Sequence, residues 1–396
     1  MVADLISLGE ARAAVLSAAE QGPLEEVALS VGLGRVLAED VAAPFDVPPF
    51  DSSAMDGYAV VAGPGGELEI RGESRAGHPS AEPARPGIAV AISTGAPIPD
   101  GADAVVPVER TDPAGDGRVR VSASEPGANL RRAGEDLRRG QPAVPAGSPL
   151  GPAELGVLAS LGRDRALCAT RPRVALVVTG DELAEPGEPL EPGRIYSSNA
   201  SALAAQAAQA GAEVNLRSRV PDDREATEAA IGAGLDSADV VLISGGVSVG
   251  PHDHVKPALQ ALGVQEQFWR VSLKPGKPTW FGKRGRTLVF GLPGNPVSAM
   301  VCFQLFVRPA LRILQGADPE AMRVSARLAA PWKANPARTE AVRCRLRSDE
   351  RGLVAEPTGD QGSHRLSSML GADGLALVPS AEDELAPGTD VVVELL

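Results

Sequence analysis

Three glycine-rich segments each follow a run of apolar residues, and their composition suits the binding of phosphate groups. They cover residues 179–182, 244–250 and 291–296. Glycines allow the backbone to approach a ligand closely, and successive backbone amides can surround an anion. Because the carboxyl ends of parallel strands meet at one edge of a sheet, we expect the three segments to line one crevice. Asn295 suits the N-cap and Pro296 the first position of a helix whose N–H groups would point toward that crevice.

Five carboxylates are expected at the same edge: Asp181, Glu182, Asp222, Asp223 and Asp253. Acidic side chains beside anion-binding loops require a cation between them, and Mg²⁺ held by carboxylates and by a substrate phosphate would satisfy both. The sequence therefore predicts a magnesium site that includes Asp181, Glu182 and Asp253. Asp222 and Asp223 have a second interpretation, in which they only cap a helix and interact with its dipole.

Three further groups of residues have both a chemical and a structural interpretation. Lys274 and Lys277 lie in a Lys-Pro-Gly-Lys-Pro turn, which can be solvated surface or can bind an oxyanion. His252 and His254 flank an aspartate, but the chain has four histidines and no cysteine nearby, so a zinc site lacks its remaining ligands. Cys302 stands in an apolar run and is expected in the core.

The composition argues against several classes of protein. The 396 residues carry a net charge of −13 and have a pI near 4.9, which disfavours a nucleic-acid binder that uses a broad cationic surface. No apolar run approaches the roughly 18 residues of a membrane span, and the N-terminus lacks the pattern of a secretory signal. The three cysteines form no CxxC motif. We therefore expect a cytoplasmic protein that binds neither nucleic acid nor membrane.

The first part of the chain predicts two domains, one inserted in the other. Short alternating strands bounded by turn residues predict a β-domain over 45–140. The flanking segments, 1–44 and 141–170, predict a discontinuous linker domain with helices. One of these begins at a capping box formed by Ser7 and Glu10, and we expect the helix over 152–161 to pack against it.

The second part predicts an α/β domain followed by a β-domain, so the expected fold class is multidomain, α/β plus β. Strands and helices alternate over 171–317, which predicts a doubly wound, mostly parallel sheet. Residues 318–396 return to strands. There, Arg343, Arg345 and Arg347 alternate with apolar residues, which predicts one buried face and one mostly solvated basic face.

Eight motifs, in order along nearly the whole chain, resemble those of one family, the molybdopterin molybdenumtransferases (the MoeA and gephyrin C-terminal-domain group). They are Phe-Asp-Ser-Ser-Ala-Met-Asp-Gly-Tyr-Ala at 50–59, Ser-Thr-Gly-Ala-Pro-Ile-Pro at 93–99, Gly-Glu-Asp at 134–136, Thr-Gly-Asp-Glu-Leu at 179–183, Ser-Gly-Gly-Val-Ser-Val-Gly at 244–250, Lys-Pro-Gly-Lys-Pro at 274–278, Leu-Pro-Gly-Asn-Pro-Val-Ser at 292–298 and Gln-Gly-Ser-His at 361–364. Ser197 departs from the family pattern, which often has Asp at this position.

The resemblance implies an enzyme that inserts molybdenum into adenylylated molybdopterin, using molybdate and releasing AMP and the molybdenum cofactor, with Mg²⁺ as cofactor. It also implies a homodimer whose site lies between the α/β domain of one chain and the β-domain of the other, and possible handover of substrate from a molybdopterin adenylyltransferase. A cysteine cluster is not expected, because the pterin dithiolene itself supplies the soft sulfur ligands.

Carried over position by position, the resemblance implies two sets of site residues. The catalytic set is Asp56, Thr94, Asp136, Glu182, Asp222 and Asp253. The substrate-binding set implied by the resemblance is Lys274, Lys277, Pro293, Pro296, Arg343 and Ser363, with Arg343 and Ser363 reaching the oxyanion from the tail. The glycine-rich segments add Gly180, Asp181, Ser244, Gly245, Gly246, Ser248, Gly294 and Asn295 to this set.

Two other functions remain open on the sequence. The α/β segment alone also resembles the fold that adenylylates molybdopterin, although the motifs around Asp56 and Asp136 are superfluous for that activity. A non-catalytic scaffold that binds molybdopterin without turnover is the third interpretation.

Overall fold

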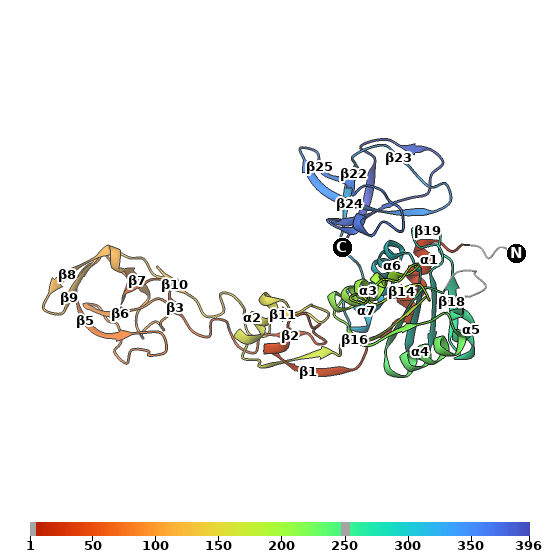
Figure 1. The fold of residues 1–396 in the computed structure, drawn as a ribbon. Coiled ribbons are helices and arrows are strands. Elements are labelled where there is room, and N and C mark those ends of the chain that lie inside the picture. The colour runs from red at the N-terminus through yellow and green to blue at the C-terminus, as the bar shows by residue number, and fades with distance from the viewer. Residues whose placement is uncertain (1–4, 247–253) are drawn as a thin grey trace.

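The chain is extended, with a β-rich body at one end, an α/β body at the other and a small linking body between them (Figure 1). A second β-rich body, formed by the C-terminal segment, lies beside the α/β body. The structure, a computed structural model, describes residues 5–246 and 254–396. Two predicted site residues, Ser248 and Asp253, lie outside the described residues.

The α/β body is built on a six-stranded sheet with the order β16-β13-β17-β21-β20-β18. The first four strands are parallel, and β20 and β18 are antiparallel to their neighbours. This arrangement confirms the predicted doubly wound, mostly parallel sheet. The strands are β13 (Arg173–Thr179), β16 (Glu213–Val220), β17 (Val240–Ser244), β18 (Gln265–Trp269), β20 (Trp280–Arg284) and β21 (Thr287–Leu292).

Helices cover both faces of this sheet, which is why its central strands are continuously apolar. Alternate residues of β13 enter opposite layers: Val174 and Leu176 pack into one core, and Ala175 and Val177 into the other. Each such buried valine or leucine contributes about 1.5–3 kcal/mol to folding. The first core is closed by α3 (Ser198–Gln209), α6 (Pro296–Cys302), η3 (Phe303–Val307) and α7 (Arg308–Leu314). The second is closed by α4 (Arg224–Ser237) and α5 (Val255–Ala261).

The segments α6, η3 and α7 form one continuous helix. This helix, Pro296–Leu314, is long and apolar enough by composition to cross a membrane, but 78% of its apolar window is buried inside the protein. Its apolar character is explained by its place in the first core of the α/β body.

The N-terminal helix belongs to the α/β core. The helix α1 (Leu8–Ala18) begins at the predicted capping box, in which the amide of Glu10 donates to Ser7 Oγ and the Glu10 carboxylate accepts from the Ser7 amide. Its buried residues Ala11 and Val15 lie in the first core, against η3 and α7. The expected packing of the 152–161 helix on this helix is therefore wrong. Capping identifies where a helix begins, but the partner of its apolar face is decided by the tertiary fold.

The linking body joins two distant segments of the chain. Its strands pair across the insertion, β1 (Leu24–Ala28) with β12 (Arg165–Ala169) and β2 (Val41–Ala42) with β11 (Pro142–Val144). The remaining elements are η1 (Leu29–Val31) and the helix α2 (Pro152–Ser160), whose Leu158 is buried in the core of this body.

The inserted β-rich body contains a six-stranded sheet with the order β7-β4-β6-β5-β9-β8. The predicted strands near residues 58, 68, 88, 104 and 118 are all present. The elements are β3 (Ser52–Ser53), β4 (Gly57–Val60), β5 (Gly66–Ser74), β6 (Ile88–Ile92), β7 (Ala104–Pro107), η2 (Val108–Arg110), β8 (Thr111–Gly115), β9 (Arg118–Val121) and β10 (Leu130–Arg131), of which β3 and β10 pair separately.

The C-terminal body is a small barrel, because its strands β24-β25-β22-β28-β26 close back onto β24. The strand β19, from the α/β segment, pairs with β24 and so ties the two bodies together. The elements are β19 (Leu273–Lys274), β22 (Arg323–Leu328), β23 (Trp332–Lys333), β24 (Thr339–Asp349), β25 (Gly352–Pro357), η4 (Leu366–Met369), β26 (Gly374–Val378), β27 (Glu384–Leu385) and β28 (Asp390–Leu395).

Candidate active site

A pocket with a volume of about 730 Å³ lies at the carboxyl edge of the parallel strands. Each of the four parallel strands sends a loop into its wall, so the predicted crevice is present. The loops contribute Gly180 and Glu182 after β13, Asp222 after β16, Gly245 and Gly246 after β17, and Pro293 to Pro296 after β21. Ligands of open parallel sheets bind at this edge.

Two of the glycines hold the loops in conformations that other residues cannot adopt. Gly245 has φ of 97°, and an added Cβ would lie 2.7 Å from the carbonyl oxygen of Thr179. Gly180 has φ of 149°, and an added Cβ would collide with the carboxylate of Glu182. The loops after β13 and β17 therefore pack against one another through bare backbone.

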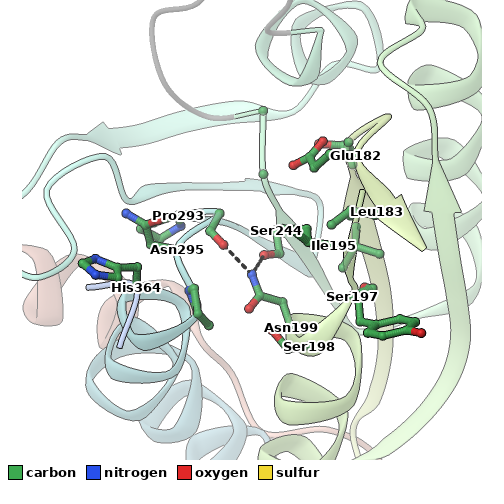
Figure 2. Close-up of a pocket in the computed structure, with 18 of the residues that line it drawn as sticks. Glu182, Leu183, Ile195, Ser197, Ser198, Asn199, Ser244, Pro293, Asn295 and His364 are labelled. Carbon is green, nitrogen blue, oxygen red and sulfur yellow. Dashed lines mark hydrogen bonds between the residues drawn. The ribbon is translucent and has the colours of Figure 1, made fainter. Parts of the chain in front are cut away.

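Asn199, in the first turn of α3, connects two of these loops. Its Nδ2 donates to Ser244 Oγ and to the carbonyl oxygen of Gly294, both at 2.8 Å (Figure 2). Both hydrogens of the side-chain amide are thereby donated, and Oδ1 takes part in neither hydrogen bond. This bridge sets the separation of the loops that follow β17 and β21.

Acidic side chains line one part of the pocket. Glu182 and Asp222 belong to the lining, while Asp181 is exposed outside it and accepts a hydrogen bond at 3.1 Å from the Asp222 amide. Asp223 instead caps α4, accepting from the Ala226 amide at 2.9 Å. Capping therefore accounts for Asp223, whereas Asp222 lines the pocket and its predicted chemical role stays a prediction.

The oxygen ligands in this region match the preference of Mg²⁺ for carboxylates. Glu182 and Asp222 face the pocket, and Asp181 is adjacent. Among residues 5–246 and 254–396, no three His, Cys, Asp or Glu side chains are grouped closely enough to hold a metal ion. Asp253, the third expected ligand, is one of the residues that the structure does not describe.

The two lysines of the 274–278 turn lie beside the pocket and not in its lining, although Pro278 does line it. Lys274 Nζ forms an ion pair at 2.8 Å with Glu340, a carboxylate that is 4% exposed and also accepts from the Trp332 indole. Lys277 is exposed. Beneath the turn, Thr279 donates to the Gly276 carbonyl oxygen at 2.6 Å and Cys302 is buried.

A loop of the C-terminal body closes one side of the pocket. His364 lines the pocket, and Figure 2 shows it beside Asn295 and Pro293. The neighbouring Ser363 accepts a hydrogen bond from Asn295 Nδ2 at 2.9 Å, and its carbonyl oxygen accepts from the Val297 amide at 3.2 Å. Asn295 therefore occupies the predicted N-cap position but directs its side chain to this loop.

Arg343 lies beneath that loop and does not line the pocket. Its guanidinium donates to Ser368 Oγ and to the carbonyl oxygens of Asp360 and Gly362. The residue is 0% exposed, so the predicted solvated basic face begins only at Arg345. Burial lowers the pKa of Arg343 to about 10, which leaves it ionised at neutral pH. The alternation of residues along β24 predicted that Arg343 shares a face of the strand with Arg345, but it did not predict the loop that covers Arg343.

The three residues expected from the β-domain lie far from the pocket of the same chain. Asp56 accepts a hydrogen bond from the Thr94 amide at 2.7 Å, which lowers the pKa of the Asp56 carboxyl. Asp136 is held by its amide, which donates to the Val47 carbonyl oxygen. Figure 1 shows the β-rich body that holds Asp56 and Thr94 at the opposite end of the molecule from the α/β body, whereas Asp136 precedes Leu137, which packs against the core of the linking body.

The pocket also contains residues that were not among the predicted site residues. They are Val178, Thr179, Leu183, Ile195, Tyr196, Ser197, Ser198, Asn199, Pro278 and His364. The sequence held a signal for some of them: Ser197 departs from the pattern of the resemblance, and the quoted motifs contain Thr179, Leu183, Pro278 and His364. The short parallel pair β14 (Leu183–Ala184) and β15 (Ile195–Tyr196) carries several of the others to the pocket.

Comparisons with known proteins identify relatives over the whole length of the chain. Three family models match: the MoeA N-terminal region (domain I and II) over residues 6–162, a probable molybdopterin binding domain over 175–313, and the MoeA C-terminal region (domain IV) over 325–396.

Individual relatives agree with these models. A molybdopterin molybdenumtransferase from Haemophilus influenzae is 36% identical over 401 residues, covering 98% of both chains. Molybdopterin molybdenumtransferase 2 from Mycobacterium tuberculosis is 38% identical over 385 residues, covering 93% of this chain and 94% of that one. The crystal structure of a molybdopterin biosynthesis MoeA protein from Pyrococcus horikoshii OT3 superposes with a TM-score of 0.84 at 30% identity, covering 99% of this chain and 100% of that chain.

Proposed function

The chain belongs to the MoeA family of molybdopterin molybdenumtransferases, and on that premise we propose that it inserts molybdenum into molybdopterin. The substrates are adenylylated molybdopterin and molybdate, and the products are AMP and the molybdenum cofactor. The observation that carries the proposal is the convergence of four loops, one from each parallel strand, on a single pocket that contains carboxylates.

The chemistry of this pocket suits a substrate that contains a pyrophosphate. Glu182 and Asp222 line it, with Asp181 adjacent, and these oxygens suit a magnesium ion shared with the substrate phosphates. Such an ion, when bound, would withdraw charge from the scissile pyrophosphate. The protein's own contribution is to position these carboxylates through the glycine loops. The exposed Lys277, next to the lining residue Pro278, offsets the charge of an arriving oxyanion, whereas Lys274 is paired with Glu340.

The proposal includes a homodimer whose sites are shared between subunits. Asp56, Thr94 and Asp136 cannot reach the pocket of their own chain, because the linking body separates their domain from it (Figure 1). A second copy, arranged about a two-fold axis, would bring its β-domain to the pocket. Exposed apolar side chains occur on both parts, with Ile195 and Tyr196 at the pocket and Met55 next to Asp56. We place the reaction in the cytoplasm, with adenylylated molybdopterin handed over by an adenylyltransferase.

The test is an incubation of the protein with adenylylated molybdopterin, Mg²⁺ and molybdate, in which AMP and active cofactor are measured. The proposal requires release of AMP that depends on molybdate and yields active cofactor. Reaction only with unadenylylated molybdopterin and ATP would identify an adenylyltransferase instead. Binding without release of AMP would identify a scaffold.

Two variants test the carboxylates. We expect Asp181→Ala and Asp56→Ala to slow AMP release by at least about tenfold, the effect of losing one charge-stabilising contact. Asp223→Ala is the matched control, because it removes a charge from the same region but affects only the cap of α4. Wild-type rates in both test variants would contradict the proposed role of the carboxylates.

A further inference from the structure

Glu340, near the start of β24 in the C-terminal barrel, is a buried carboxylate that pairs with one of the two lysines beside the pocket. It is 4% exposed, and its Oε1 lies 2.8 Å from Lys274 Nζ. Its Oε2 accepts hydrogen bonds from the Trp332 indole and from the Asn335 amide, both at 3.0 Å. Three donors therefore fix the position of the carboxylate, whereas the side chain of Lys274 is 50% exposed and has room to move.

The second lysine of the 274–278 turn has no such partner. Lys277 is exposed, and within residues 5–246 and 254–396 it forms no ion pair and no side-chain hydrogen bond. The turn therefore carries one paired cation and one free cation, next to Pro278 in the wall of the pocket. A carboxylate in contact with a lysine cancels most of the attraction that the lysine exerts on another anion.

The pair of Lys274 and Glu340 is not needed to join the two bodies, because the backbone already joins them there. The strands β19 and β24 are parallel neighbours, with Lys274 opposite Glu340. The Thr339 amide donates to the Ser272 carbonyl oxygen at 3.1 Å, and Ser272 Oγ donates to the Ala337 carbonyl oxygen at 2.7 Å. A buried ion pair adds little net stability, because desolvation of the charges offsets their attraction. A role in the charge of the pocket therefore explains the pair better than a role in folding.

We propose that Glu340 is the resting counterion of Lys274 and thereby sets the affinity of the pocket for the oxyanion substrate. Without an oxyanion, the ammonium group stays on Glu340. An arriving oxyanion takes the ammonium group over, and the carboxylate keeps its hydrogen bonds to Trp332 and Asn335. Oxyanion binding is then weaker by the free energy of the ion pair that it breaks. Glu340 is a positioning residue, since it acts through Lys274. The inference rests on the proposed function and adds to it the residue that limits oxyanion binding.

Glu340→Gln in the full-length protein tests this role, because it should strengthen binding, which damage to the fold would not do. The amide oxygen of glutamine stays with the two donors of Trp332 and Asn335, so its NH2 group faces Lys274 and releases it. We expect the dissociation constants of molybdate and of sulfate, measured by calorimetry, to decrease about three- to tenfold. Both dianions respond alike, because an ammonium group is a point charge without a preferred geometry.

Salt and steady-state kinetics separate this role from a structural one. The gain in affinity should shrink as NaCl is raised from about 0.05 M to about 0.5 M, because dissolved ions screen the charges. The KM for molybdate in AMP release should decrease by the same factor as the dissociation constant. A residue that mattered only for folding would lower kcat and the melting temperature and would not lower this KM.

Two further variants serve as controls. Glu266→Gln removes the same charge from a carboxylate that also accepts from an indole, that of Trp280 at 2.6 Å, but it lies on β18 and should bind molybdate as wild type does. A double variant, Lys274→Met with Glu340→Gln, removes the whole pair. It should bind molybdate no more tightly than wild type, because the released lysine is the source of the gain.

A measurement on the wild-type protein provides a test that does not depend on the folding of Glu340→Gln. Departure of Lys274 from Glu340 changes the charge next to the Trp332 indole. Tryptophan emission should therefore shift as sulfate or molybdate saturates the site, whereas chloride at the same ionic strength should not shift it. Trp332→Phe should lack this shift, which assigns the signal among the three tryptophans of the chain.

The inference is overturned if folded Glu340→Gln protein binds molybdate no more tightly than wild type does, or if the double variant keeps the gain. It is also overturned if saturating oxyanion leaves the emission of wild-type protein unchanged, or if a wild type that releases AMP binds neither oxyanion. Failure of the proposed function gives a different result, namely a wild-type protein that releases no AMP, whatever its affinity for molybdate and sulfate.

Discussion

Two inactive variants of this protein are expected to restore one another when they are mixed. In the proposed dimer, each site takes Glu182 from the α/β body of one chain and Asp56 from the β-domain of the other. A dimer of Asp56→Ala and Glu182→Ala chains contains one site with both substitutions and one site with neither. The intact site works at the wild-type rate, because the substituted residues lie at separate ends of each chain (Figure 1).

The expected recovery of AMP release follows from the fraction of intact sites in the mixture. Random exchange of subunits makes half of the dimers mixed, and each mixed dimer has one intact site of two, so the mixture regains about a quarter of wild-type AMP release. The assay is AMP release after the two proteins are unfolded together and refolded, with the oligomeric state checked by light scattering. Each variant refolded alone is the control. A mixture of dimers no more active than these controls would refute a site shared between chains.

Three further predictions concern single features of the structure. Arg343→Lys should lower the free energy of unfolding by about 1–3 kcal/mol, because it leaves buried acceptors unpaired, and should weaken the saturation of AMP release by molybdate; unchanged saturation would argue that the loop over Arg343 plays no part in molybdate binding. Gly245→Ala should cost about 1–3 kcal/mol in denaturant unfolding, whereas Gly294→Ala, with no atom closer than 3.8 Å and no positive φ, should be tolerated. Native protein at pH 8 should be inert toward a thiol reagent and unfolded protein should react at three positions, because burial raises the pKa of each thiol and excludes the reagent; rapid reaction of native protein would contradict the burial of Cys168, Cys302 and Cys344.

The sequence predicted the α/β sheet and the place of its pocket well, because both follow from local patterns. Continuous apolar runs such as that of β17 indicate strands buried on both faces, and the glycine segments mark where they end. Since all parallel strands end at one edge, the convergence of their loops needs no knowledge of long-range contacts. Strand β20, with its mixed composition, had no such signal and was not predicted.

The features that the sequence did not predict depend on contacts between distant segments. Nothing local to Arg343 indicates that a loop some twenty residues later covers it, so its burial could not be read from alternation alone. Asn199 gave no motif of its own, because its importance comes from bonds to Ser244 and to Gly294, 45 and 95 residues away. The partner of α1 was misjudged for the same reason.

The place of α1 has a consequence for how the molecule is made. Helix α1 packs against η3 and α7, which are synthesised nearly three hundred residues after it. Its apolar side therefore has no packing partner while the linking body, the inserted β-rich body and most of the sheet are synthesised. The α/β body can be completed only when its beginning and its end, separated by two other bodies along the chain, come together.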